Sequence, residues 1–135
     1  MHFSTATALT ILAAVSQASA WTITLYNNVE NCDANDSTEY QIIEGNQGDC
    51  YTLGASMPRT TCEHFTDGGI NKKGCRGLFK ATSVAIPRGT NCQFYGLDFC
   101  QSLSIYGDEG KCRNNRELLA GPGDYFRSFK CENDE

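Results

Sequence analysis

The sequence lacks the features on which most small enzymes, zinc proteins and membrane proteins depend. Of its 135 residues only two are histidines, and His64 is the only one after residue 20. It contains no C-x-x-C pair and no G-x-S-x-G, and no later segment approaches the ~18 consecutive apolar residues of a membrane span. Its 11 basic and 16 acidic side chains give a net charge of −5, whereas nucleic acids and anionic membranes attract basic surfaces. We therefore expect no zinc site, no nucleic-acid partner and no membrane span.

The first twenty residues have the pattern of a secretory signal peptide. An apolar stretch runs from Ala6 to Val15 and is too short to span a bilayer. Ala18-Ser19-Ala20 has the small-x-small form that signal peptidase cleaves. No Lys or Arg precedes the apolar stretch, so the positive charge comes from the terminal amine and His2. This pattern predicts a signal peptide over 1–20, a single domain over 21–135, and a secreted, extracellular protein.

All the cysteines follow the predicted cleavage point. An even number of cysteines in a short exported chain indicates a disulfide framework. Eight cysteines allow 105 pairings, and the sequence does not choose among them. The disulfide residues are Cys32, Cys50, Cys62, Cys75, Cys92, Cys100, Cys112 and Cys131.

Short strand-like runs separated by glycine-rich turns dominate residues 21–135. Trp21–Tyr26 alternates between apolar and polar residues, which is typical of a half-buried strand. The longest run of β-forming residues is Leu78–Ile86. Helix is scarce: "NNRELLAG", with Asn115 as N-cap, and "TTCEHF" each suit a helical turn. The sequence predicts an all-β, disulfide-stabilised antiparallel sandwich or barrel with little helix.

Three segments occur twice, in the same order. "ITLYNNVENC" resembles "NCQFYGLDFC", "QIIEGNQGDC" resembles "SLSIYGDEGKC", and "GLFKATSV" resembles "DYFRSFKC". This repetition predicts two Greek-key-like repeats, over residues 21–86 and 87–135, that pack face to face and share one core. The repeat also gives a conditional disulfide pattern: if Cys32 pairs with Cys50, Cys100 should pair with Cys112.

The order of these segments resembles the double Greek key of βγ-crystallins and killer toxins. The stretch "SVAIPRGTNCQFYGLDF" is similar to that family's passage into its second motif. The glycine that the family places six to seven residues after its aromatic is absent: Cys32-Asp33 and Gln101-Ser102 stand there. The family's calcium signature is absent too. The resemblance implies the architecture without a calcium site.

No constellation of catalytic, cofactor-binding or metal-binding residues stands out. Arg59, Glu63 and His64 suit a small ribonuclease, but neighbouring residues on a strand point to opposite faces, so a surface histidine is the simpler interpretation. Asp33 to Glu44 places oxygen ligands at calcium-loop spacing without the glycine that such loops require, which favours a solvated acidic loop. We predict no enzyme activity, no cofactor and no metal.

Three surface features have a more specific interpretation. Asn35-Asp36-Ser37 is an acceptor sequence for N-glycosylation at Asn35. The basic cluster "INKKGCRGLFK" (70–80) favours a solvated loop over a binding site. Candidates for exposed aromatic contacts are Tyr106, Tyr125, Phe126 and Phe129, of which alternation must bury about half.

The format of the chain resembles fungal small secreted cysteine-rich proteins, the effectors and elicitors known from genera such as Trichoderma. The resemblance implies a non-enzymatic protein that acts by recognition at the plant or microbial interface. Its partner would be an extracellular protein or cell-surface component of the host plant or of a microbe. The alternatives are a killer-type toxin, a protease inhibitor that presents Arg88 in "AIPRGTN", and a small ribonuclease. Homodimerisation through an edge strand stays open.

Overall fold

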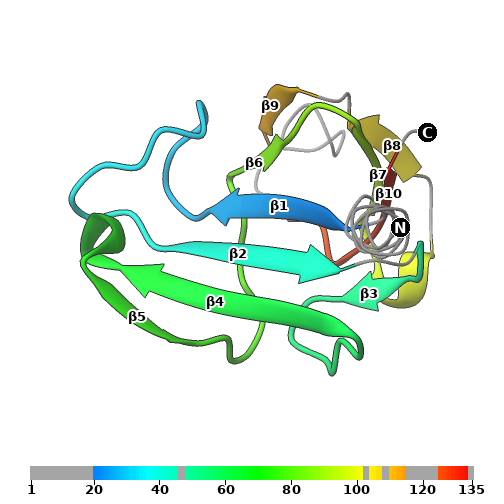
Figure 1. Ribbon diagram of the computed structural model, residues 1–135, viewed down its shortest axis with the longest axis horizontal. Helices are drawn as coiled ribbons and strands as arrows, with labels where there is room; N and C mark the ends of the chain where they lie inside the picture. The colour runs from blue at the N-terminus through cyan, green and yellow to red at the C-terminus, as the bar shows by residue number, and fades with distance from the viewer. Residues whose placement is uncertain (1–19, 46–47, 102–103, 108–109, 115–124, 134–135) are drawn as a thin grey trace, which may run out of the picture.

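The computed structural model describes residues 20–45, 48–101, 104–107, 110–114 and 125–133, with the side chains of 104–107 left out (Figure 1). Apart from Ala20, the predicted signal peptide lies outside these residues, as does the helical turn predicted from Asn115.

Strands and turns make up nearly all of the described chain. The strands are β1 (Trp21–Tyr26), β2 (Tyr40–Gly45), β3 (Tyr51–Thr52), β4 (Thr60–Thr66), β5 (Asn71–Gly74), β6 (Ser83–Ile86), β7 (Thr90–Tyr95), β8 (Ser104–Gly107), β9 (Lys111–Asn114) and β10 (Ser128–Asn133). Two single-turn 3-10 helices, η1 (Asp67–Gly69) and η2 (Asp98–Cys100), lie between them. Neither has the length or hydropathy of a membrane-spanning helix, and the described residues contain no other helix. The predicted all-β class is confirmed.

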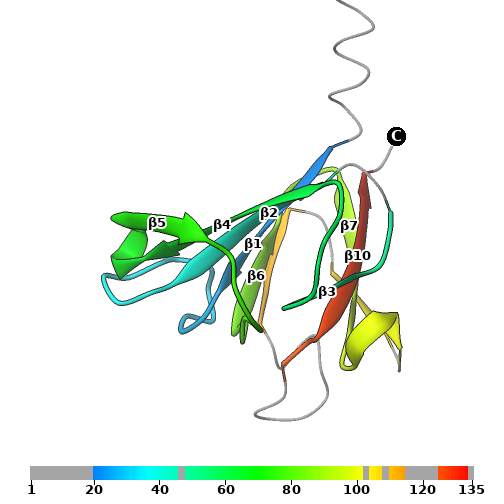
Figure 2. The ribbon, with the colours of Figure 1, turned by 90° about the horizontal axis from the view of Figure 1, so that it is seen from below.

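The strands form two antiparallel sheets that lie against each other as separate layers (Figure 2). The larger sheet has the order β5-β4-β2-β1-β6-β9, and the smaller sheet has the order β3-β10-β7-β8. Within the described residues each sheet keeps two open edges, so the fold is a sandwich and not a closed barrel. In Figure 2 the β4–β5 hairpin extends away from the smaller sheet.

The core lies between the two sheets and combines aliphatic side chains with a cluster of aromatic rings. In β1 the alternation predicted from the sequence points Trp21, Ile23 and Leu25 inward, and all three are buried. The ring of Trp21 packs edge-on against that of Phe129 in β10, with centroids 5.9 Å apart. Such edge-to-face pairs contribute beyond the burial of their apolar area. Sequence alternation was therefore a sound guide to which face of these strands is buried.

The two halves of the chain have the same strand order, and each contributes one strand to the other half's sheet. The order β2-β1-β6-β9 in the larger sheet corresponds to β8-β7-β10-β3 in the smaller one. Strand β3 comes from the first half but lies in the smaller sheet, and β9 comes from the second half but lies in the larger sheet. This arrangement is a pair of Greek keys with exchanged third strands.

Equivalent hydrogen bonds fix the first connection of each half. Ser83, at the start of β6, donates to the carbonyl of Val29 at 2.6 Å. Ser128, at the start of β10, donates to the carbonyl of Leu97 at 2.5 Å. Val29 and Leu97 each lie three residues before a cysteine, Cys32 or Cys100. Both serines are buried, so the same polar contact anchors the same turn in both halves.

The disulfides follow the strand exchange, which settles the pairing that the sequence left open. The bonds are Cys32–Cys112, Cys50–Cys100, Cys62–Cys75 and Cys92–Cys131. Cys32 does not pair with Cys50, so the condition of the pattern derived from the repeat is not met: Cys112 lies in β9 and Cys50 immediately precedes β3, and each of these strands belongs to the sheet of the opposite half. The first two disulfides are equivalent, and each joins the first connection of one half to the third strand of the other.

Two of these cysteines adopt a backbone conformation that is typical of a turn glycine. Cys32 has φ 57° and Cys100 has φ 54°, the left-handed conformation that glycine adopts most easily. Each cysteine is held there by its disulfide and the packing of the connection, which offsets the conformational cost of about 1 kcal/mol or more.

Two local expectations were wrong. "TTCEHF" forms no helical turn and belongs to β4, the longest strand of the described chain, because its β-branched and inward-facing residues suit a strand. In Leu78–Ile86 only Ser83–Ile86 is strand, since Gly77 at φ 68° turns the chain and Phe79 leaves the sheet to pack against His64. Strands β4 and β5 extend the larger sheet beyond β2, whereas the smaller sheet ends at the equivalent strand β8, so the β4–β5 hairpin is an addition to one Greek key.

Candidate functional site

His64 is a structural residue, buried on the inner face of β4, and not the surface histidine expected from the sequence. The amide nitrogen of Gln41 lies 3.0 Å from His64 Nδ1, and Glu39 Oε1 lies 2.8 Å from Nε2. The amide nitrogen donates and the carboxylate accepts, so this arrangement corresponds to the tautomer protonated at Nε2. Phe79 packs edge-on against the imidazole at 5.7 Å. Both ring nitrogens are engaged within the fold, which leaves neither directed to a substrate.

The three residues of the ribonuclease hypothesis do not converge. Arg59 forms an exposed ion pair of 2.8 Å with Asp49. Glu63 faces the opposite side of β4 from His64, and its Oε1 lies 3.6 Å from Lys72 Nζ. As the sequence reasoning anticipated, neighbouring positions on the strand separate the carboxylate from the imidazole.

The acidic stretch with calcium-loop spacing is also dispersed. Asp33 and Asn35 lie in the exposed connection between β1 and β2, whereas Glu39 contacts His64 and Glu44 accepts a hydrogen bond from Thr22 on the outer face of the larger sheet. Within the described residues no three His, Cys, Asp or Glu side chains converge as metal ligands.

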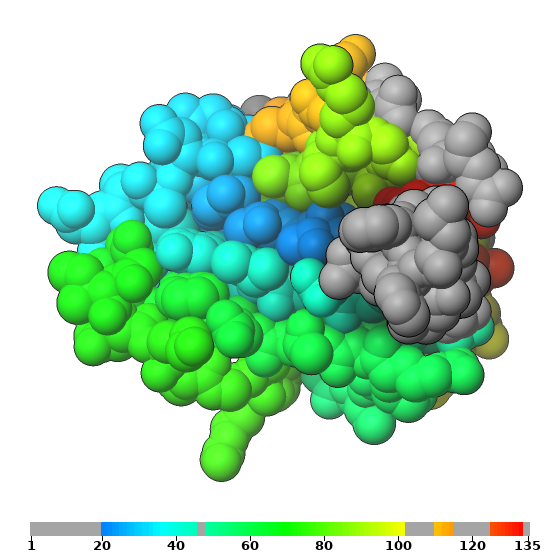
Figure 3. All heavy atoms as spheres, viewed as in Figure 1, coloured from blue at the N-terminus to red at the C-terminus, as the bar shows by residue number. Residues whose placement is uncertain are grey.

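Asn35 lies at an accessible position of the same connection. Its side-chain oxygen accepts hydrogen bonds from the backbone nitrogen and the hydroxyl of Ser37, at 2.9 and 2.8 Å. In the space-filling view the connection lies beside the β4–β5 hairpin at one end of the molecule (Figure 3), and the backbone bond from Gly68 to the carbonyl of Thr38 joins the two segments. Glycosylation of Asn35 stays a prediction.

Arg88 is exposed in the tight turn between β6 and β7. The backbone nitrogen of Thr90 donates to the carbonyl of Pro87 at 3.2 Å, and Gly89 has φ 89°. A protease binds its substrate in an extended conformation, so this closed turn is poorly shaped for the inhibitor hypothesis.

A row of aromatic side chains in contact with one another crosses the outer face of the larger sheet. Tyr26, Tyr40 and Phe65 occupy paired positions on β1, β2 and β4, with successive centroid distances of 5.8 and 4.8 Å. Burial, with smaller contributions from Tyr40 and Asp33, raises the pKa of Tyr26 above its ordinary value. The rings are half-buried against one another, so the row stabilises the pairing of these strands.

The most exposed aromatic side chain among the described residues lies in the connection between β7 and β8. Phe99, in η2, is 70 % exposed, and its neighbour Leu97 is 55 % exposed. Sequence reasoning missed both: of its candidates, Phe126 and Phe129 are buried in the core, Tyr125 is half-buried, and the side chain of Tyr106 is not described. The alignment of the two repeats could have indicated the exposure of Phe99, because Phe99 corresponds to the polar Asn31 of the first half.

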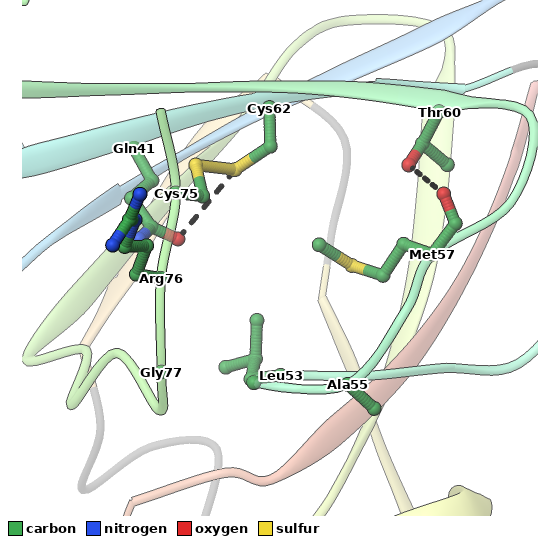
Figure 4. A pocket seen from close by; sticks show the side chains of 10 residues that line it. Gln41, Leu53, Ala55, Met57, Thr60, Cys62, Cys75, Arg76 and Gly77 are labelled. Carbon is green, nitrogen blue, oxygen red and sulfur yellow. Dashed lines mark hydrogen bonds between the residues drawn. A yellow bond between two sulfur atoms is a disulfide. The ribbon is translucent and has the colours of Figure 1, made fainter. Parts of the chain in front are cut away.

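A pocket of about 240 Å³ opens between the β4–β5 hairpin and the turn after β3 (Figure 4). Leu53 and Met57 line one side, and Gln41, Arg76 and the Cys62–Cys75 disulfide line the other. Arg76 belongs to the basic cluster that the sequence assigned to a solvated loop. Two candidate binding features among the described residues are therefore the exposed apolar loop and this mixed polar and apolar pocket.

Comparison with known proteins identifies a related family. A family model described as "Secreted LysM effector LysM14, C-terminal domain" matches residues 21–131. The match spans most of the chain and begins at Trp21. Searches of curated proteins and of solved structures give no match.

Proposed function

The chain belongs to the family of the C-terminal domain of the secreted LysM effector LysM14, and from this premise we propose that it is a non-enzymatic effector domain that binds an extracellular component of a plant or a microbe. The family is one of secreted proteins, so the domain acts outside the cell that produces it. The binding surface that we propose is the loop Leu97–Cys100, with Phe99 as its central contact.

The conformation of Phe99 is the observation that carries this proposal. A large aromatic side chain at φ 61° is unfavourable by about 1 kcal/mol or more, and here it gains little core packing in return because most of it is exposed. Backbone strain of this kind is concentrated at binding and catalytic sites. A residue that lowers stability without filling the core supports a role in binding.

The fold itself does not require an aromatic residue at this position. In the first half Asn31 occupies the place of Phe99 and does not have a positive φ. The corresponding connection has an equivalent serine-to-carbonyl contact and an equivalent disulfide, but it has a polar residue at this position and a different backbone conformation there. A Greek key of this chain is therefore formed without an aromatic residue and without a positive φ at this position.

The loop holds Phe99 in a fixed position. The backbone nitrogen of Phe99 donates to Thr52 Oγ1 at 2.9 Å, and that of Cys100 donates to Ser128 Oγ at 2.8 Å. Cys100 is also bonded to Cys50. A loop fixed in this way loses little conformational entropy on binding, which raises affinity.

The surroundings of Phe99 match the usual composition of a protein-binding surface. Leu97 extends the apolar area, and Asp98 forms an ion pair of 3.0 Å with Arg127 at its edge. Binding energy at interfaces is concentrated in a few aromatic and Arg side chains surrounded by a polar rim. The expected partner is an extracellular protein or cell-surface component with an apolar recess that accepts the phenyl ring.

Two observations support a function without catalysis. His64 has both ring nitrogens engaged by Gln41 and Glu39, and all eight cysteines are in disulfides. General acid-base catalysis by a histidine and nucleophilic catalysis by a cysteine both need these side chains to be free to reach a substrate.

Leaf infiltration with the purified, oxidised protein tests the proposal, with the oxidative burst and cell death as readouts. We expect a response to the oxidised protein, none to the reduced and alkylated protein, and a response reduced at least tenfold for Phe99→Asn. Ile70→Asn is the matched control: Ile70 is 84 % exposed but follows η1, at the tip of the β4–β5 hairpin. Equal responses to wild type and Phe99→Asn would exclude this loop as the binding surface.

A second outcome would favour the killer-toxin alternative, which the double Greek key arrangement also supports. No response in several plant species, together with inhibited growth of yeasts or filamentous fungi in culture, would replace the plant partner by a microbial one. RNA cleavage that is lost in His64→Gln would contradict the non-enzymatic proposal.

A further inference from the structure

At the pocket beside the β4–β5 hairpin lies a buried polar side chain, Gln41, whose oxygen has no hydrogen-bond donor among the described residues. Gln41 is 2 % exposed, projects from β2 toward the pocket (Figure 4), and uses its amide nitrogen to contact His64. Its Oε1 lies 3.7 Å from Cys62 Sγ. That sulfur is bonded to Cys75 and carries no proton, so Oε1 accepts no hydrogen bond from the described residues. Buried acceptors without a donor are rare in proteins.

Arg76 supplies the pocket with a positive charge. Residues 70–80 carry four of the 11 basic side chains and none of the 16 acidic ones. Two of these cations already have partners, since Lys72 lies 3.6 Å from Glu63 and Lys80 lies 6.0 Å from the ring centre of Tyr125. Within the described part of the chain no carboxylate lies within ion-pair distance of Arg76. A guanidinium at the wall of a pocket is suited to bind a carboxylate.

Leu53 and Met57 give the pocket an apolar patch opposite Gln41, in a lining that is otherwise largely polar. Leu53 is almost fully buried and Met57 packs against the core, while the Cys62–Cys75 disulfide closes the side between them and Gln41. A volume of about 240 Å³ equals that of roughly eight water molecules, which suits a ligand of about a dozen non-hydrogen atoms.

We propose that this pocket binds a small amphipathic carboxylic acid that also carries a hydrogen-bond donor. The carboxylate pairs with Arg76, an N–H or O–H of the ligand donates to Gln41 Oε1, and the apolar body contacts Leu53 and Met57. A free acylated amino acid and the last residue of a peptide with an apolar C-terminus share this chemistry. The site is separate from the Phe99 loop, so its existence does not depend on the function proposed above.

Titration of the oxidised protein by two-dimensional ¹⁵N–¹H NMR tests this site with N-acetyl-leucine as the probe. We expect saturable shifts of the Leu53, Gly54 and Gly77 amides with a Kd in the low millimolar range, as is typical of so small a ligand. N-acetyl-leucine amide lacks the carboxylate and 4-methylpentanoate lacks the N–H, so each should bind at least tenfold more weakly. The proposal is overturned if neither shifts nor saturation occur at 20 mM probe (about ten times the expected Kd), or if the amide binds as well as the acid.

Two variants identify the cation. Arg76→Gln should weaken binding of N-acetyl-leucine at least tenfold, whereas Lys80→Gln, which removes the same charge from the same segment, should change the Kd less than twofold. Equal effects of both substitutions would mean that only the general positive charge matters and would overturn the assignment. A short peptide that ends in leucine, compared with its C-terminal amide, distinguishes the two sources: tighter binding of the peptide acid than of N-acetyl-leucine assigns the site to peptide ends, and weaker binding assigns it to free acids.

Discussion

Removal of the Cys32–Cys112 disulfide gives a quantitative test of the exchanged-strand topology. The two cysteines are 80 residues apart in sequence, and a loop of that length alone predicts a stabilisation of about 4.5 kcal/mol through the unfolded chain. The Cys50–Cys100 disulfide lowers this predicted stabilisation, because it shortens the loop in the unfolded chain. In the unfolded protein a shorter route runs from Cys32 to Cys50, across that disulfide to Cys100, and on to Cys112.

The effective loop is therefore about 30 residues, for which the same relation gives about 3.6 kcal/mol. Cys32→Ala with Cys112→Ala should lower the free energy of unfolding by that amount. Cys32→Gly with Cys112→Ala should be about 1 kcal/mol less destabilising, because glycine removes the cost of the left-handed φ of 57° at residue 32. The difference between the two variants isolates the backbone term.

Equilibrium unfolding in guanidinium chloride measures both quantities, with mass spectrometry to verify that the other six cysteines stay oxidised. The double variant Cys62→Ala with Cys75→Ala is the reference, since its 13-residue loop predicts about 2.9 kcal/mol. A loss for Cys32→Ala with Cys112→Ala that is clearly smaller than this reference would refute the reasoning. A stability for the glycine variant no higher than for the alanine variant would refute the strain argument.

Three further predictions concern single residues. Phe99→Asn should raise the free energy of unfolding by about 1 kcal/mol, a rise in Tm of about 4 °C, because Asn tolerates the left-handed region better; a fall in Tm on calorimetry would contradict this. Ser128→Ala should cost about 2 kcal/mol and roughly twice as much as Ser83→Ala, because it leaves two partly buried backbone groups unpaired and not one; equal losses in urea unfolding would contradict the assignment. Burial, followed by the nearby Asp49 and opposed by Arg59, raises the pKa of Tyr51 above about 10. The folded state therefore favours the neutral phenol. The contribution of Tyr51 to the free energy of unfolding is complete below pH 10 and is lost as the pH rises through the pKa of Tyr51 in the folded protein. A midpoint of urea unfolding that falls equally with pH in wild type and Tyr51→Phe would refute this.

Much of the fold could be predicted because strands are indicated by the pattern of neighbouring residues along the sequence. Alternation with period two marked the inward residues of β1, and the repeated segments marked equivalent strands and the cysteines Cys32 and Cys100. These features depend on neighbours along the chain. The equivalence of the cysteines was therefore visible even though their partners were not.

The exchange of β3 and β9 could not be read from the sequence. A strand of two or four residues carries the same pattern whichever sheet it joins, because its partner is chosen by the path of the connections and not by its own residues. Cys50 immediately precedes β3 and Cys112 lies in β9, so the disulfide pairing could not be predicted for the same reason.

The candidate sites were hidden by long-range packing. Phe99 is exposed because the serine contact and the Cys50–Cys100 disulfide hold its loop away from the core, and these involve residues 28 to 50 positions apart. Gln41 and Arg76 meet at a pocket only because the β4–β5 hairpin folds back beside the turn that follows β3. In the sequence alone, nothing distinguishes Arg76 from the other three basic residues of 70–80.

The most direct test of the central claim is competition for binding sites on intact plant cells. Fluorescently labelled wild-type protein is bound to leaf cells in the presence of a hundredfold excess of unlabelled protein. The account predicts that unlabelled wild type and Ile70→Asn displace the label and that Phe99→Asn does not. Equal displacement by Phe99→Asn, or binding that no excess displaces, would contradict recognition through this loop.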